Sequence, residues 1–543
     1  MSETTNGHHR SHQQKKVIII GAGVGGSAAA ARLAKNGFQV EVYEKNEFSG
    51  GRCSLIHKNG HRWDQGPSLL LMPKLFEEAF ADLGENIYDH MEIRKCPINY
   101  RVYFHDGKSV ELSSDLAALK RQVEAFEGDN EQTLLNFTAW LKETHIHYEH
   151  SVRFALKTPF RSIWDLIKIK YLPELFNLHL FESVYRRAKK YFKSEHMIKA
   201  FTFQTMYMGM SPYDSPGPYS LLQYTEIAEG IWYPKGGFHK VVEKLEHLAR
   251  DKFGAKFHYN QPIRKIITDK NDKATGIELE DGTEINADIV VCNADLVYAY
   301  NKLLPPTKYA ENLATKEHTS SSISFYWGLK EKVDKFSVHN VFLASAYRES
   351  FDEIFKKHTL PSQASFYVNV PSRIDSDAAP EGKDTMVVLV PTGHMTNMPG
   401  DMDALVARAR RQVIDVIEER MGIKDFASYI ETEIINDPRT WGEKFNLWNG
   451  SILGLTHSVF QVLAFRPNLK SPVFKDLYFV GASTQPGTGV PIVLCGSKLL
   501  ADQIMLDHGK TSNKANNSLT PMTILLPFFF LILYGLAKIF GLI

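Results

Sequence analysis

Residues 16–44 contain the feature that most limits what this chain can fold into: an apolar run, a glycine-rich turn, an alanine-rich segment and a second apolar run. Residues 17–20 form a β-branched run that ends at glycine, as in a strand buried on both faces of a parallel sheet. The glycines that follow, in the spacing G-x-G-x-x-G, are Gly21, Gly23 and Gly26. A helix and a second strand then lead to Glu44. This order predicts a dinucleotide site.

Each residue of the turn has a physical role in such a site. Gly21 permits the tight turn, Gly23 lets the backbone approach a pyrophosphate, and Gly26 lets helix and strand pack closely. The first N–H groups of the helix face the phosphates, and the helix dipole favours their charge. Glu44 occupies the position at which a carboxylate accepts hydrogen bonds from a ribose. A negative charge there disfavours the 2′-phosphate of NADP. Glycines in this spacing also occur in ordinary turns, and the complete context favours a dinucleotide here.

The cofactor is expected to be larger than a nicotinamide dinucleotide. A second glycine pair, which ends at Gly51, and the neighbouring Arg52 come soon after Glu44. They fit FAD, because Gly51 allows close approach and Arg52 adds positive charge beside a pyrophosphate and ribityl chain. Residues 61–68 carry a turn signal that should return the chain to the cofactor.

The cofactor domain is predicted to be discontinuous. Residues 261–267 and a hairpin over 275–285 are expected to resume its sheet, and 287–294 should be a buried return strand. Residues 477–491 are an apolar strand running into a third glycine-rich turn, which repeats the anion-site arrangement for the ribityl and pyrophosphate side of a flavin. We therefore assign three ranges to the FAD-binding domain: 16–95, 224–300 and 471–509.

The remaining ranges divide by pattern. Residues 96–120 and 301–470 alternate strands with a long helix over 402–421 and should form a substrate domain, whereas 121–223 are mostly helical. The basic, aromatic-rich part of that helical region, 153–199, fits either an anionic membrane surface or an ordinary amphipathic subdomain. The Met- and Tyr-rich residues from 206 to 220 fit a core or the wall of an apolar pocket.

Composition excludes several classes of protein. The 63 basic and 62 acidic residues leave a net charge of +1, so nucleic acid is not an expected partner. The four cysteines are scattered, which suits a reducing compartment without disulfides or a cysteine metal site. His145, His147 and His150 are read as a solvated or hydrogen-bonded cluster rather than a zinc site. No metal is expected, and residues 1–15 are predicted to be a disordered tail.

The C-terminal residues 522–543 are apolar apart from Lys538, and as a helix they are long enough to cross a bilayer core of about 30 Å. A polar linker, 510–521, separates them from the rest. We expect a C-terminal transmembrane anchor with the catalytic part facing the cytosol, because the lysines precede the apolar segment. A buried core helix and a lipid-anchor signal are the alternatives. The expected fold class is α/β: a discontinuous Rossmann-like FAD-binding domain, an α+β substrate domain, a helical subdomain and this helix.

Several motifs together resemble the fungal and bacterial-type phytoene desaturases of the amine-oxidase-like flavoproteins. They are Gly-Gly-Arg-Cys-Ser at 50–54, Asp-Gln-Gly-Pro-Ser at 64–68, Glu-Gly-Ile-Trp-Tyr-Pro-Lys-Gly-Gly-Phe at 229–238 and Val-Gly-Ala-Ser-Thr-Gln-Pro-Gly-Thr-Gly-Val-Pro at 480–491. The resemblance implies FAD contacts at Gly21, Gly23, Gly26, Glu44, Gly51, Arg52, Ile263, Gly481 and Gly489. It also implies that Gly66, Pro67, Pro486, Gly487, Thr488 and Val490 lie near the flavin ring or substrate.

The same resemblance implies conversion of phytoene to lycopene by successive desaturations, with oxygen or a quinone as electron acceptor and the bilayer as the source of substrate. A C40 polyene offers no heteroatom, so recognition requires an apolar tunnel. Its protons are too weakly acidic to leave first, so hydride loss should precede proton loss, and Asp214 and Glu226 are candidate bases only through their motifs. Three alternatives share this scaffold: a carotenoid isomerase or saturase, an amine oxidase, and a non-enzymatic prenyl-protein carrier.

Overall fold

The computed structural model describes residues 14–166, 177–396 and 401–509. The chain divides into two compact units, Met1–Ala501 and Asp502–Ile543. Of the second unit only residues 502–509 are described, and they include the end of helix α16 (Val490–Asp507). Residues 1–13 of the predicted tail, the linker 510–521 and the predicted anchor 522–543 lie outside the described residues. All that follows concerns the first unit.

A five-stranded parallel sheet positions the glycine-rich turns. Its strand order is β19-β13-β1-β2-β9, so β1 lies between two neighbours that come later in the chain. The strands are β1 (Lys16–Ile20), β2 (Gln39–Tyr43), β9 (Lys256–His258), β13 (Ile289–Cys292) and β19 (Leu477–Phe479). Helix α1 (Val24–Lys35) joins β1 to β2 and packs against α10 (Lys240–His247). The carboxyl ends of β1, β2, β13 and β19 therefore meet at one edge, which is where open α/β sheets bind ligands.

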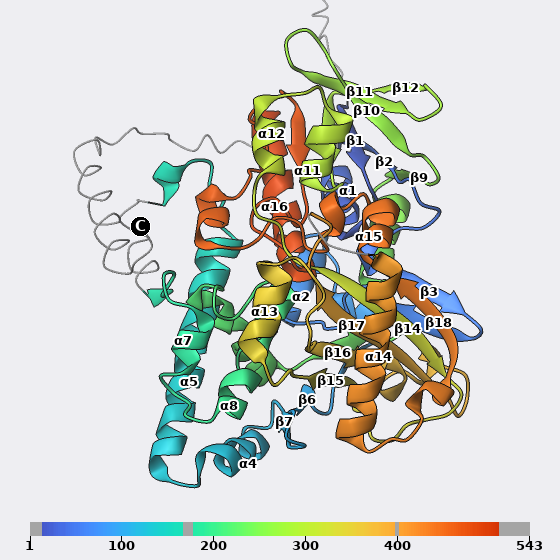
Figure 1. The fold of residues 1–543 in the computed structure, drawn as a ribbon. Helices are drawn as coiled ribbons and strands as arrows, with labels where there is room; N and C mark the ends of the chain where they lie inside the picture. Colours follow the sequence, from blue (N-terminus) through green and yellow to red (C-terminus); the bar gives the residue numbers. More distant parts are fainter. Residues whose placement is uncertain (1–13, 167–176, 397–400, 510–543) are drawn as a thin grey trace, which may run out of the picture. The chain divides into compact units, whose positions relative to one another are not determined.

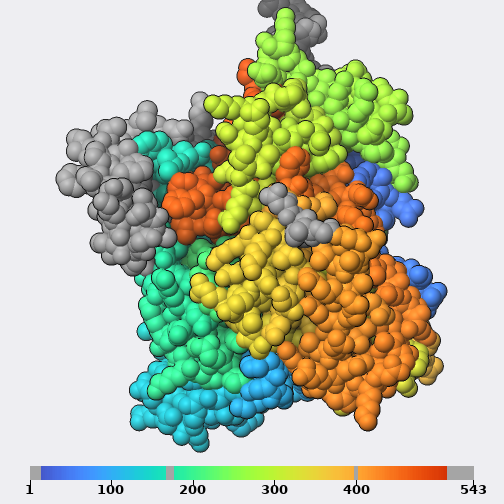
Figure 2. Space-filling model, viewed as in Figure 1, coloured from blue at the N-terminus to red at the C-terminus, as the bar shows by residue number. Residues whose placement is uncertain are grey.

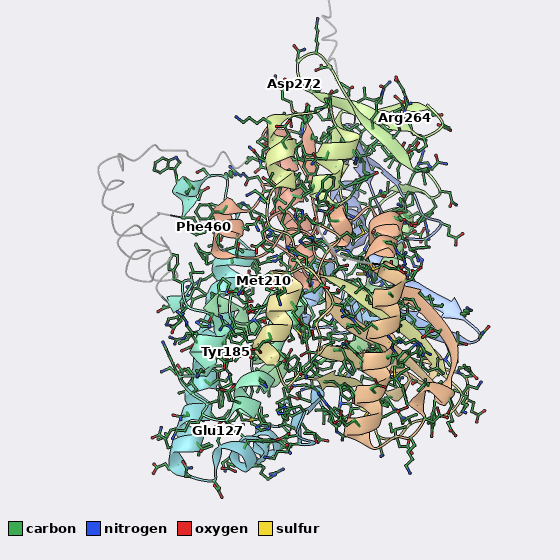
Figure 3. The ribbon with its side chains drawn as sticks, in the orientation of Figure 1. Glu127, Tyr185, Met210, Arg264, Asp272 and Phe460 are labelled. Atoms are coloured by element: carbon green, nitrogen blue, oxygen red, sulfur yellow. The ribbon has the colours of Figure 1, made fainter. Side chains whose placement is uncertain are left out.

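The hairpin expected to extend this sheet forms a separate one. Strands β10 (Ile263–Thr268), β11 (Ala274–Leu279) and β12 (Glu284–Asn286) make a three-stranded antiparallel sheet, and Figure 1 shows it as the green ribbon at the top. In Figure 3, Arg264 and Asp272 mark this sheet. The strand that joins the parallel sheet from this part of the chain is β9, whose three residues are too few to show a periodic pattern. The predicted placement of 261–267 and 275–285 in the cofactor sheet is therefore wrong, because these residues form a sheet of their own.

A second, mixed sheet of seven strands has the order β18-β14-β17-β16-β15-β6-β7. Its strands are β6 (Tyr100–Tyr103), β7 (Ser109–Leu112), β14 (Ser321–Leu329), β15 (His339–Phe342), β16 (Phe366–Asn369), β17 (Asp384–Thr392) and β18 (Ile430–Asn436). Helix α14 (Met402–Met421), drawn in orange in Figure 1, lies across it. Val413 and Ile417 on this helix share one hydrophobic core with Phe325 and Trp327 of β14.

The helical region shares a hydrophobic core with strands β6, β7 and β15 of the second sheet. Its main helices are α4 (Leu116–Glu127), α5 (Glu131–His150), α7 (Val184–Ala188) and α8 (Glu195–Ala200), and Figure 3 labels Glu127 and Tyr185 in this region. Trp140 and Phe192 are buried together in its core. Phe154 and Phe160 are buried as well, whereas Trp164 and Phe181 are exposed. Among the described aromatic residues of 153–199, some therefore belong to the core and others reach the surface.

Shorter elements complete the described part of the chain. They include β3 (Leu55–Lys58), β4 (His61–Asp64), α2 (Pro73–Ala81), α3 (Ile87–His90), β5 (Ile93–Lys95), α9 (Leu221–Tyr224), β8 (Trp232–Pro234), α11 (Leu296–Tyr298), α12 (Lys308–Ala314), α13 (Tyr347–Phe355) and α15 (Pro438–Phe445). Within the described residues, none of the helices combines the length and apolar character that a membrane crossing requires.

Candidate functional site

A cavity of about 650 Å³ begins at the carboxyl edge of the parallel sheet and extends toward the second sheet and the helical region. Its volume lies in the range of small-molecule and cofactor sites. The predicted residues that line it are Gly21, Gly23, Glu44, Gly51, Arg52, Gly66, Pro67, Ile263, Gly481, Pro486, Gly487, Thr488, Gly489 and Val490. Gly26 does not line it. Segments distant in sequence therefore converge on one cavity.

The first glycine turn is shaped by backbone geometry. Gly21 has φ +91°, a region that favours glycine. A Cβ atom on Gly26 would lie 2.0 Å from the Gly21 carbonyl oxygen, so helix α1 crosses the turn in direct backbone contact. A Cβ atom on Gly23 would instead meet the side-chain Nδ2 of Asn293 at 2.9 Å. Gly26 thus acts through packing, and Gly23 acts at the cavity surface.

The Glu44 carboxylate is buried at the end of β2 and is held by the backbone. It accepts hydrogen bonds from the N–H of Ala22 and the N–H of Asn46, each at 2.9 Å. This arrangement fixes a carboxylate next to the first helical turn, at the position where a ribose is expected. It also connects the ends of β1 and β2.

We expect Glu44→Gln to weaken FAD binding by about 10- to 100-fold. Glutamine has one acceptor oxygen, so one of the two backbone N–H groups loses its partner, and the negative charge toward the ribose is also lost. Titration of the apoprotein with FAD, followed by flavin fluorescence, measures the Kd. The control is Glu47→Gln at an exposed position three residues on. Equal Kd values for the two variants would contradict the role given to Glu44.

The second glycine turn presents a buried cation. Gly50 and Gly51 have φ values of +100° and +54°, and they turn the chain into a short helix at Gly51–Cys53. The Arg52 guanidinium donates to the Ile452 carbonyl, and burial lowers the pKa of Arg52, an effect that the nearby Asp295 opposes. A Cβ atom on Gly66 would lie 2.4 Å from the Arg52 carbonyl oxygen, so Gly66 is needed for this turn to close. The positive charge remains beside the cavity, where a pyrophosphate would be favoured.

The third glycine-rich turn, after β19, is fixed by hydrogen bonds from the side chain of Arg466. The Arg466 side chain is buried and donates only to backbone carbonyls. Its acceptors are Leu455 at 3.3 Å, Thr456 at 3.0 Å, Gln461 at 2.9 Å, Thr484 at 3.0 Å and Ala482. Beside it, His457 Nε2 accepts the N–H of Thr488 at 3.2 Å. Burial, together with the charge of Arg466, lowers the pKa of His457 well below its usual value, so this imidazole is neutral.

Three contributors to the site were not singled out from the sequence: Asn293, His457 and Arg466. Asn293 follows β13, lines the cavity and donates to the Gly21 carbonyl at 3.3 Å. A polar residue directly after a buried parallel strand is a signal that could have identified it. His457 and Arg466 carry no local signal, because the partner of His457 and two of the five acceptors of Arg466 lie in the separate segment 482–488.

The far part of the cavity is apolar. Its wall includes Leu71, Leu156, Leu178, Met206, Met208, Leu222, Val462 and Leu463. Part of the Met- and Tyr-rich stretch therefore lines the cavity, while Met210, labelled in Figure 3, is buried and does not. Asp214 is exposed and Glu226 is buried, and neither candidate base lines the cavity.

Glu226 has a structural environment. Its carboxylate accepts from the Tyr100 hydroxyl at 3.0 Å and from Gln204 Nε2 at 3.2 Å. Burial raises the pKa of Glu226 to about 8, because these two hydrogen bonds offset only part of the desolvation. At neutral pH this side chain is mostly protonated, which does not suit a general base.

The raised pKa of Glu226 predicts a pH dependence of protein stability that can be measured. Between pH 4.5 and about 8 the folded protein retains a proton on Glu226 that the unfolded chain releases, so stability falls as pH rises through this window. The slope from this group is about 1.4 kcal/mol per pH unit. In Glu226→Gln this contribution is absent, and its thermal midpoint should fall by roughly 3 °C less than that of the wild type between pH 5.5 and 7.5. Parallel pH dependences in the two proteins would show that Glu226 is ionised in the fold.

Of the three histidines of α5, His147 lies in a hydrogen-bonded cluster, whereas His145 contacts the Tyr224 ring and His150 lies 3.4 Å from the Asn177 amide. His147 Nδ1 is 2.7 Å from the Ser220 hydroxyl and its Nε2 is 2.9 Å from Nδ1 of His179. The third ligand-type group nearby is Glu143, and the Arg187 guanidinium is paired with both of its oxygens. Because Arg187 already neutralises this carboxylate, the arrangement does not require a metal ion.

The parallel sheet, its glycine-rich turns and the joined cavity define a class of flavoprotein: the chain belongs to the flavin-containing amine oxidoreductase family, whose sequence profile matches residues 24–505. A structure of wild-type putrescine oxidase with bound putrescine has the same fold, with a TM-score of 0.59 and 14% identity over 91% of this chain and 99% of that chain.

Within that class the similarity to phytoene desaturases is high. The chain is 60% identical over 491 residues to phytoene desaturase of Phycomyces blakesleeanus, a match that covers 89% of this chain and 84% of that protein. It is 49% identical over 497 residues to phytoene desaturase of Neurospora crassa, which covers 89% of this chain and 83% of that protein.

Proposed function

We propose that this protein is an FAD-dependent phytoene desaturase of carotenoid biosynthesis, which converts phytoene to lycopene by successive desaturations. The observation that carries the proposal is one continuous cavity with a polar, glycine-lined part and an apolar part. The 60% identity to the Phycomyces enzyme supports the same reading. A hydrocarbon substrate and a dinucleotide cofactor require these two kinds of wall in contact with each other.

The polar part of the cavity fits FAD. Gly21 and Gly51 turn the backbone with positive φ, Glu44 supplies a fixed carboxylate, and Arg52 supplies a cation. Bound FAD would supply an oxidising ring that accepts a hydride and, overall, the accompanying proton, which accounts for both hydrogens lost when a C–C single bond of the polyene becomes a double bond. The third turn, which Arg466 fixes through hydrogen bonds to its backbone, would support the part of FAD that carries the flavin ring.

The apolar part positions the substrate by shape. Its leucine and methionine side chains exclude water, which leaves a hydrocarbon as the favoured occupant. Two of the tyrosine hydroxyl groups in the wall have partners in the protein: Tyr367 is 2.9 Å from Ser68 Oγ, and Tyr219 donates to the His457 carbonyl at 3.3 Å. These side chains therefore add bulk to the wall and need no polar group on the substrate.

We further propose a membrane location, with the catalytic part facing the cytosol and the apolar segment 522–543 as anchor. The support is the sequence of that segment together with the insolubility of a C40 hydrocarbon in water. Oxygen or a quinone is proposed as the electron acceptor. Comparing anaerobic turnover with and without an added quinone tests that choice.

The function is tested with the purified, FAD-loaded full chain and phytoene in lipid vesicles. Chromatography and absorption spectra should show products with more conjugated double bonds, ending in a red pigment. A product with unchanged conjugation and altered cis/trans geometry would identify an isomerase instead. Oxidation of an amine in place of phytoene would identify an amine oxidase.

A further inference from the structure

Five large apolar side chains are exposed close to the outer end of the cavity. They are Phe460 at 70% exposure, Trp164 at 51%, Ile163 and Phe181 at 41%, and Phe465 at 38%. We refer to these five as the mouth patch. Phe460, labelled in Figure 3, lies at the edge of the described structure in that view, and the Phe460 and Phe465 rings are 5.8 Å apart.

The patch and the cavity share the same supporting segments. Phe154, Phe160, Leu166 and Leu178 form a small core, against which Leu180, Leu463 and Ala464 pack. Leu178, Leu180 and Leu463 also line the cavity. The chain neighbours of these residues carry the mouth patch: Phe181 follows Leu180, and Phe465 follows Ala464. The mouth patch is therefore adjacent in sequence to side chains that line the cavity.

The segments are also tied to the third turn. Gln485 Nε2 donates to the Phe160 carbonyl at 2.7 Å and to the Leu463 carbonyl at 3.1 Å. Pro486, the next residue, lines the cavity. In Figure 2 the orange-red surface near residue 460 lies beside the teal surface of the helical region, so the two segments meet at the surface as well as in the core. The mouth patch is thus held in a fixed place relative to the cavity.

The chemistry of the patch fits a lipid bilayer. Clustered exposed aromatic side chains are unusual on a soluble surface, and Trp and Phe are the residues that enter the boundary between head groups and acyl chains. Arg161 is exposed two residues before Ile163 and offers a charge to lipid phosphates. A hydrocarbon substrate is dissolved in lipid, so an apolar surface at the end of its cavity has an evident source of ligand.

We propose that the mouth patch docks the protein on the bilayer surface and is where the polyene passes between lipid and cavity. This inference rests on the proposed function, since it takes the substrate to be a lipid-dissolved hydrocarbon. It assigns docking to five side chains from distant parts of the sequence, of which only Ile163, Trp164 and Phe181 belong to the basic, aromatic range 153–199. Docking here is distinct from anchoring by 522–543, because it sets which side of the protein faces the lipid.

The test uses the FAD-loaded full chain and two double variants. Trp164→Gln with Phe460→Gln alters the patch, and Leu116→Gln with Leu135→Gln removes apolar side chains of 51% and 52% exposure on α4 and α5. Phytoene is supplied in phosphatidylcholine vesicles or in detergent micelles. We expect the patch variant to lose about tenfold or more of its rate with vesicles and less than about twofold with micelles. The control variant should match the wild type in both.

A second measurement detects docking without turnover. Lipids with brominated acyl chains should quench tryptophan emission of the wild type more than that of Trp164→Phe, because Trp164 enters the bilayer. Equal quenching, or equal loss of rate in vesicles and micelles, would overturn the proposal. A patch variant that changes from dimer to monomer and shows no vesicle effect would assign the surface to a second copy. If wild type converts no phytoene in either format, the proposed function fails, while the quenching still reports on docking.

Discussion

Gly26→Ala should yield a protein with about a tenth or less of the flavin bound per chain by the wild type. The added Cβ atom would lie 2.0 Å from the Gly21 carbonyl oxygen, and both groups belong to rigid backbone. Helix α1 must then move away from β1, which separates its first N–H groups from the turn that holds a phosphate. The strain should also lower the thermal midpoint of the apoprotein by several degrees, for a cost of roughly 1–3 kcal/mol.

Two variants make this result specific. Gly23→Ala meets only the Asn293 side chain, which can rotate, so it should weaken flavin binding without destabilising the apoprotein. Gly107→Ala adds a Cβ atom that meets no atom within 4 Å at a position outside the cavity lining, and it should leave flavin content unchanged even though Gly107 itself has φ +80°. Flavin content is measured from the absorbance ratio of the purified proteins. A fully loaded Gly26→Ala protein would show that helix and strand are not in the tight contact described.

Arg466→Met should be the most destabilising single change outside the parallel sheet. The substitution removes the guanidinium donors that five backbone carbonyl groups now accept from. We expect the free energy of unfolding to fall by on the order of 3–5 kcal/mol. We expect a thermal midpoint lower by roughly 4 °C and a loss of flavin, because residues 455–461 and 482–484 lose their connection. Arg466→Lys should restore little, since one ammonium cannot reach acceptors arranged around a planar guanidinium.

The matched change is Arg420→Met on α14. Arg420 also donates to backbone carbonyls, Tyr103 at 3.2 Å and Leu343 at 2.8 Å, but these lie in the second sheet. Its loss should lower the thermal midpoint by a smaller amount and leave the flavin content intact. Scanning calorimetry and the flavin absorbance of both variants decide the matter. If Arg466→Met melts within about 2 °C of the wild type, the turn is held by other contacts.

Where a pattern is local, the sequence was enough. The β1–α1–β2 unit follows from a β-branched run, glycines and an alanine-rich helix, all within one short stretch. The predicted helix 402–421 is α14 in the structure, because its apolar periodicity and the glycine after it both act within a few residues. The glycine turns could be assigned to one site since each contains the backbone chemistry that a phosphate or a close approach requires.

Prediction failed where the outcome depended on a distant partner. The segment 261–285 has the alternation of strands, but alternation does not say which sheet a strand joins, and it formed its own. Glu226 was considered a base because of its motif, but packing buries its carboxylate, and burial raises its pKa to about 8 although Tyr100 and Gln204 donate hydrogen bonds to it. The aromatic residues of 153–199 were one group in the sequence, and packing separated them into core and surface.

The sequence by itself determined that this chain carries a dinucleotide-binding turn, two further glycine-rich turns and enough apolar residues to line an apolar pocket. These features could be identified because they are properties of neighbouring residues. Only the tertiary structure decided that Asn293, His457 and Arg466 support those turns, and that Trp164 and Phe460 reach the same face of the molecule. Their effect depends on which segments meet in space, and that depends on how whole sheets and helices bury their apolar faces together.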